Sequence, residues 1–100
     1  METQTEHFEC AIIGGGLAGL CLAIQLADNG ISTAVFEKGK YPFHKVCGEY
    51  ISMESWPFLE SLGLPLADLA LPKIHHLGIS SDRGFILNHH LGMGGFGISR

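Results

Sequence analysis

A glycine pattern, Gly14-x-Gly16-x-x-Gly19, is the feature that most restricts how this chain can fold. It follows an apolar run at residues 8–13, which is typical of a buried strand, and it precedes a helical repeat of apolar residues. Gly14 can form the tight turn, Gly16 leaves the backbone open to a ligand, and Gly19 lets the helix pack closely against the strand. The sequence therefore predicts the beginning of a dinucleotide-binding fold.

The residues around this turn predict a strand, a helix and a second strand. Apolar residues recur at helical spacing over residues 17–29, and Gly30 follows as a C-terminal cap. Residues 33–37 are mostly β-branched, aromatic or small, which is typical of a strand. Because two strands joined through one helix are parallel, we expect a parallel pair with a right-handed crossover.

The glycine turn and the acidic residue that follows it indicate a dinucleotide ligand. The first amides of a helix lack partners within the helix and the helix dipole is positive there, so a diphosphate suits this position. Glu37 ends the second strand, where a carboxylate would accept hydrogen bonds from a ribose diol and would repel the extra phosphate of NADP. The same residues serve FAD and NAD, so both cofactors stay open here, and a purely structural turn is the third alternative.

A short helix is predicted in the second half of the chain. Ser52 is placed to cap a helix that runs to about Leu62, with Pro57 tolerated in its first turn. Two aromatic residues on it, Trp56 and Phe58, would either pack in a core or line an apolar substrate cavity.

Residues 73–80 and 85–91 predict a hairpin around a turn at residues 81–84. A two-residue turn would pair the histidines of the two strands, His75 with His90 and His76 with His89. The two pairs would lie on opposite faces, whereas a metal site needs three or four ligands on one side. We therefore expect no metal site.

Composition narrows the class of protein. A chain of 100 residues forms one small domain or part of one. Its six Lys and Arg residues are scattered singly and its net charge is -4, which argues against nucleic acid as a partner.

Three widely spaced cysteines predict neither a disulfide framework nor a zinc ribbon, which favours a cytoplasmic location. Two of them, Cys10 and Cys21, fall on apolar faces and are expected in the core. The apolar residues that follow residue 10 are interrupted by glycines, so neither a signal peptide nor a transmembrane segment is expected.

Residues 14–38 resemble the N-terminus of the FAD-dependent oxidoreductase superfamily that includes p-hydroxybenzoate hydroxylase-type monooxygenases, flavin halogenases and geranylgeranyl reductases. Residues 41–50 are interpreted as a loop, and within it the sequence KVCGE at residues 45–49 resembles the geranylgeranyl reductase-like branch. The resemblance implies FAD as the cofactor. It also implies an oxidoreductase, geranylgeranyl reductase-like or monooxygenase-like, in which the flavin performs hydride or oxygen chemistry.

The resemblance also implies which residues contact the cofactor. Cys47, Gly48 and Glu49 would lie near the isoalloxazine ring, and Arg100 would reach the cofactor from a glycine-rich strand. Cys47 would act as a catalytic thiol if Lys45 lowers its pKa, and otherwise it is an unreactive loop cysteine. The residues expected at the ADP moiety are Gly14, Gly16, Leu17, Ala18, Gly19, Glu37 and Lys38.

The implied architecture is an α/β, Rossmann-like FAD-binding unit followed by the beginning of an antiparallel substrate layer. Residues 1–50 would belong to the FAD-binding domain, residues 51–98 to the substrate layer, and residues 99–100 would return to the FAD-binding domain. The chain would then be an N-terminal fragment with exposed apolar surface, inactive alone. A small apolar substrate and NAD(P)H or another electron donor are the expected partners, and the rival functions are an NAD-binding enzyme and a non-catalytic interaction module.

Overall fold

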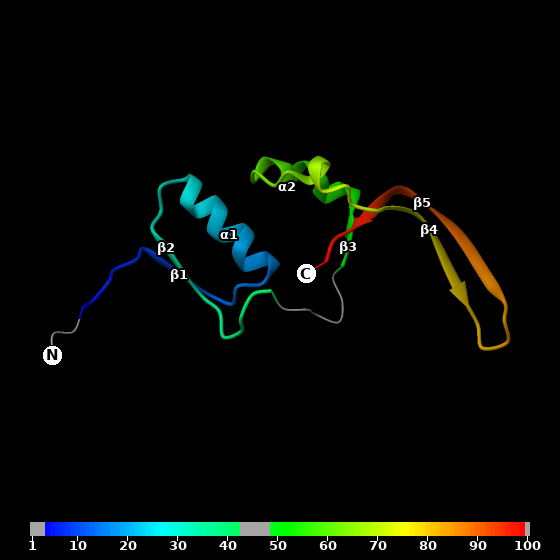
Figure 1. Cartoon of the computed structure of the whole chain (residues 1–100), viewed down its shortest axis with the longest axis horizontal. Coiled ribbons are helices and arrows are strands. Elements are labelled where there is room, and N and C mark those ends of the chain that lie inside the picture. The colour runs from blue at the N-terminus through cyan, green and yellow to red at the C-terminus, as the bar shows by residue number, and fades with distance from the viewer. Residues whose placement is uncertain (1–3, 43–48, 100) are drawn as a thin grey trace. The chain divides into compact units, whose positions relative to one another are not determined.

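The computed structural model describes residues 4–42 and 49–99 of the chain. The chain divides into two compact units, Met1–Tyr41 and Pro42–Arg100. The first unit contains β1 (Cys10–Ile13), α1 (Leu17–Asp28) and β2 (Thr33–Phe36) (Figure 1). The mixed α/β character that the sequence predicts is therefore present in the first unit.

The two strands of the first unit are parallel, with Cys10 opposite Thr33 and Ile13 opposite Phe36. This arrangement confirms the predicted strand, helix and strand. The first strand begins later than residue 8, because the Glu9 amide donates to the Ser32 side chain at 3.0 Å and the backbone ladder begins at Cys10.

The C-terminus of α1 has the geometry of a Schellman motif. Gly30 has a φ of 74°, and its amide donates to the Ala27 carbonyl at 3.0 Å. The next amide, that of Ile31, donates to the Leu26 carbonyl at the same distance. These two bonds satisfy carbonyls that the end of a helix leaves open, and they confirm the predicted cap at Gly30.

The first unit exposes much of its apolar surface. Ile12 is the one large apolar side chain that is buried in the described part of this unit, and α1 has no buried residue. Ile13 is 83% exposed and Phe36 57%. The exposed apolar surface that the sequence predicts is confirmed, and an exposed surface of this kind favours association.

The second unit is built on an antiparallel sheet with the strand order β3-β5-β4. Figure 1 shows β4 and β5 as a long two-stranded ribbon that continues past the short β3. Its elements are β3 (Tyr50–Ser52), the 3-10 helix η1 (Met53–Ser55), α2 (Trp56–Ser61), the 3-10 helix η2 (Leu66–Leu69), β4 (Lys73–Ser80) and β5 (Ile86–Gly97).

The predicted helix after Ser52 is present in two parts. The Ser52 hydroxyl accepts the Glu54 amide at 3.4 Å, so Ser52 caps η1, and α2 follows with Pro57 in its first turn. The cap is confirmed, although the first turn is a 3-10 turn and the α-helix begins only at Trp56. No helix in residues 4–42 and 49–99 is long and apolar enough to span a membrane.

The core of the second unit forms around Phe96, which is fully buried. Trp56 packs edge to face against it, with ring centroids 5.0 Å apart, and the Lys73 ammonium lies 5.4 Å from the centroid of the Trp56 ring. Leu59 and Leu66 are also buried. Trp56 is thus a packing residue, as one of the two interpretations held, whereas Phe58 is 45% exposed.

The hairpin is present, but its predicted register is wrong by one residue. The structure pairs His76 with His90 and Leu77 with His89.

The turn of the hairpin explains this register. The Ser81 amide donates to the Phe85 carbonyl at 2.8 Å, and the Gly84 amide donates to the Ser81 carbonyl at 3.1 Å. With Gly84 at a φ of 82°, this is a three-residue loop with a bulge and not the two-residue turn assumed from the sequence.

The second hairpin strand is also longer than predicted, because β5 continues through the glycine-rich residues to Gly97. Gly95, Phe96 and Gly97 pair with β3, and Gly95 and Phe96 also pair with the start of β4. Pairing on both sides extends the strand beyond residue 91. His75 lies at a register irregularity between Ile74 and His76.

Candidate functional site

The glycine turn between β1 and α1 is shaped by Gly14. Gly14 has a φ of 106°, a conformation that residues with a side chain rarely adopt. Its amide donates to the Phe36 carbonyl at 2.8 Å, so the turn leaves the sheet at the end of the β1–β2 ladder. The tight turn predicted at Gly14 is confirmed.

Gly19 sets how closely α1 approaches β1. A Cβ atom at this position would collide with the Gly14 carbonyl oxygen and would lie 3.2 Å from the Ile12 side chain. The close packing of helix against strand that the sequence predicts at Gly19 is therefore confirmed.

Gly16 is the N-cap of α1, and the space where a side chain would begin is open. A Cβ atom on Gly16 would meet nothing within 4 Å, and Gly16 supplies no side-chain cap to the first amides. The first turn also contains no acidic side chain that would offset the positive end of the helix dipole. The amides of this turn, those of Leu17 and Ala18 included, thus need an acceptor from outside the helix, and the position fits a diphosphate.

Glu37 lies directly beside the turn. One oxygen of its carboxylate accepts the Gly15 amide at 3.0 Å, and the other accepts the Gly39 amide at 2.6 Å. Each carboxylate oxygen can accept more than one hydrogen bond, and these two bonds hold the group beside the turn. The structure brings the acid and the glycine turn together, while Lys38 is exposed in the segment after β2.

Tyr41 is a part of this site that sequence reasoning missed. Its hydroxyl donates to the Gly15 carbonyl at 2.6 Å. Gly15 is buried, and a Cβ atom there would collide with the Tyr41 hydroxyl and lie 3.1 Å from the Glu37 Cβ atom. The available signal was the middle one of three consecutive glycines, since the G-x-G-x-x-G pattern does not require glycine at residue 15.

Of the residues predicted near the isoalloxazine ring, Glu49 alone belongs to the part of the chain that the structure describes. Cys47, Gly48 and Arg100 lie outside the described residues, as does Lys45. Glu49 belongs to the second unit, where its carbonyl accepts the Ile98 amide at 2.9 Å. These contacts with the cofactor stay predictions.

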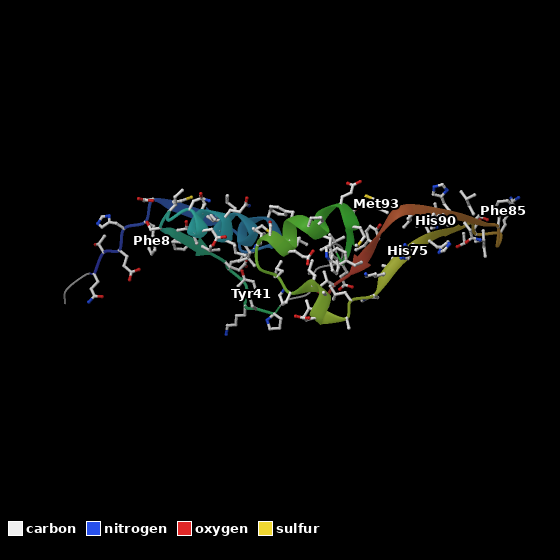
Figure 2. The ribbon with its side chains drawn as sticks, turned by 90° about the horizontal axis from the view of Figure 1, so that it is seen from above. Phe8, Tyr41, His75, Phe85, His90 and Met93 are labelled. Carbon is white, nitrogen blue, oxygen red and sulfur yellow. The ribbon has the colours of Figure 1, made fainter. Side chains whose placement is uncertain are left out.

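Two of the four histidines of the hairpin lie opposite each other. His76 and His90 have ring centroids 5.2 Å apart, and Figure 2 shows His75 and His90 along the same ribbon. Within residues 4–42 and 49–99, no group of three or more His, Cys, Asp or Glu side chains is placed to hold a metal ion.

Cys10 and Cys21 are half-buried free thiols and not the core residues expected.

A family model described as an FAD-binding domain matches residues 9–45. The match covers β1, the glycine turn, α1, β2, Glu37 and Tyr41, which are the elements that form the site above. The match indicates FAD as the cofactor. It does not distinguish the reductase from the monooxygenase branch that the resemblance implies.

The chain is also similar to one of the subunits of a dehydrogenase. A subunit of the anaerobic glycerol-3-phosphate dehydrogenase of Vibrio vulnificus is 31% identical over 70 residues, which cover 69% of this chain and 16% of that protein. The corresponding protein of Yersinia pestis is 35% identical over 63 residues, or 63% of this chain and 15% of that protein. The matched part of the chain thus spans about a sixth of the length of these curated relatives.

Proposed function

We propose that this chain binds the ADP moiety of FAD at its glycine turn and serves an FAD-dependent oxidoreductase. The observation that carries the proposal is the open N-cap at Gly16 with the oriented Glu37 carboxylate beside the same turn, within the segment that matches the FAD-binding model. Together they offer donors for a diphosphate and an acceptor for a ribose.

The roles of the residues follow from their positions. The backbone at Gly16, Leu17 and Ala18 would donate to the pyrophosphate, because these are the first amides of α1 and Gly16 has no side chain in the way. Glu37 would accept the ribose hydroxyls. The bound flavin supplies two-electron redox chemistry, and the contribution of this part of the protein is to bind and orient it.

The finer assignment rests on the resemblance and on the relatives. The loop around Cys47 and Gly48 would approach the isoalloxazine together with Arg100, as in a geranylgeranyl reductase-like or monooxygenase-like enzyme with a small apolar substrate and NAD(P)H or another donor. The names of the relatives favour a dehydrogenase over a hydroxylase. We therefore propose hydride transfer at the flavin, and Cys47 is the candidate catalytic thiol of that reaction.

An NAD-binding enzyme is the second candidate, since an N-cap glycine and an acid after the second strand serve either dinucleotide. The match to an FAD-binding domain favours FAD. A non-catalytic interaction module, the third candidate, would bind neither cofactor at the turn.

The test is a calorimetric titration of the purified full chain with FAD and with NAD⁺. We expect saturable binding of FAD, weaker binding of NAD⁺, and FAD affinity reduced at least about tenfold in Gly16→Ala, because the new methyl group occupies the place of the pyrophosphate. Gly92→Ala is the matched control, since its Cβ atom also meets nothing within 4 Å. Preference for NAD⁺, no binding of either cofactor, or equal losses in the two variants would contradict the proposal.

A further inference from the structure

Tyr41, which is labelled in Figure 2, lies in the segment that follows β2 and contacts the glycine turn through its hydroxyl. It is separated from Gly15 by 26 positions in the sequence, and its hydroxyl donates to the Gly15 carbonyl at 2.6 Å in a partly buried setting. The contact lies within the first unit, so it is a property of the same unit that carries the turn.

The Gly15 carbonyl belongs to the same peptide group as the Gly16 amide. A peptide group is planar and trans, so its carbonyl and its N–H point in opposite directions. When Tyr41 fixes the Gly15 carbonyl, it also fixes the Gly16 N–H, which must point away from the Tyr41 hydroxyl. Gly16 is the N-cap where space for a ligand is open.

The preceding peptide group is held as well, because the Gly15 amide donates to the Glu37 carboxylate at 3.0 Å. Two residues that follow β2 thus fix Gly15 at both its amide and its carbonyl. Three consecutive glycines would otherwise sample many backbone conformations. Fixing them before the ligand arrives lowers the entropy that binding has to remove.

We infer that Tyr41 is a positioning residue for the nucleotide, and that it acts by orienting the Gly16 amide toward the diphosphate. The inference rests on the proposed function and adds a residue that the glycine pattern does not contain. It also explains why residue 15 is glycine, since a Cβ atom there would occupy the place of the Tyr41 hydroxyl.

The test compares Tyr41→Phe with Tyr50→Phe in the full chain, using FAD and ADP as ligands in calorimetric titrations. Tyr50 is the chain's other tyrosine, and it lies in the second unit. We expect Tyr41→Phe to raise the Kd of both ligands by about two- to tenfold, the effect of one lost hydrogen bond, with unchanged stoichiometry. Both ligands carry the diphosphate, so the factor should be similar for each.

The outcomes separate this inference from the proposed function. If the unmodified chain binds FAD and ADP but Tyr41→Phe binds them equally well, the inference is wrong and the proposed function stands. The inference also fails if Tyr41→Phe lowers the stoichiometry at an unchanged Kd, which would mark a purely structural role, or if Tyr50→Phe loses as much affinity. An unmodified chain that binds neither ligand would overturn the proposed function and this inference together.

Discussion

The Glu37 carboxylate accepts the Gly15 amide at 3.0 Å, which joins the end of β2 to the glycine turn. Its second oxygen accepts the Gly39 amide at 2.6 Å. The acid that is expected to bind a ribose is therefore oriented by two backbone amides. Four sets of substitutions test the structural relationships around this site and in the hairpin.

Glu37→Gln should weaken FAD binding by roughly ten- to a hundredfold, because a neutral amide loses the charge-assisted bonds to the ribose and one of the two backbone amides. Glu60→Gln removes the same charge from an exposed position on α2 and should leave the Kd unchanged. Flavin fluorescence titrations of both variants measure the difference. Equal affinities would show that Glu37 has no part in binding.

Gly15→Ala should destabilise the chain, because the new methyl group displaces the Tyr41 hydroxyl from the Gly15 carbonyl and crowds the Glu37 Cβ atom, which would lie 3.1 Å away. Adding Tyr41→Ala should relieve part of this cost, with a coupling free energy of about 0.5–3 kcal/mol between the two sites. Urea unfolding of the two single variants and the double variant gives this coupling. Strictly additive effects would contradict the contact between residues 15 and 41.

Gly19→Ala distinguishes close packing from ordinary helix propensity by the sign of its effect. In an unobstructed helix, alanine is more stable than glycine by about 1 kcal/mol. Here the Cβ atom would collide with the Gly14 carbonyl oxygen, so we expect a destabilisation of about 1–3 kcal/mol. Chemical unfolding measures the change, and a more stable variant would show that α1 and β1 are farther apart.

The hairpin register can be tested with paired cysteines. Residues His76 and His90 are directly opposite, at a separation that suits a disulfide, so His76→Cys with His90→Cys should oxidise readily. His75→Cys with His90→Cys, the pair predicted from the sequence, should not. Peptide mass mapping identifies each bridge. Efficient formation of the second bridge would contradict the observed register and support the two-residue turn.

The first unit could be predicted from the sequence because each of its signals is local. Gly14 forms a turn, Gly19 lies where helix meets strand, and Gly30 caps a helix, and each role depends on neighbours within a few residues. The position of Glu37 after β2 follows from the same short unit.

The features that sequence reasoning missed depend on longer contacts or on the conformation of one turn. Tyr41 contacts Gly15 over a separation of 26 positions, and no pattern around residue 41 itself marks the contact. The length of β5 depends on pairing with β3, and the register of the hairpin depends on Gly84 taking the left-handed conformation. A shift of one residue reverses the faces of a strand, so the predicted histidine pairs were wrong.

The most direct test of cofactor binding at the glycine turn is a two-dimensional amide NMR spectrum of the full, isotopically labelled chain during a titration with FAD. We expect saturable shifts that are largest for the Gly16, Leu17 and Ala18 amides, with the Gly92 amide unchanged. Shifts that are largest along β4 and β5, or a spectrum that does not change on addition of FAD, would contradict binding at the turn.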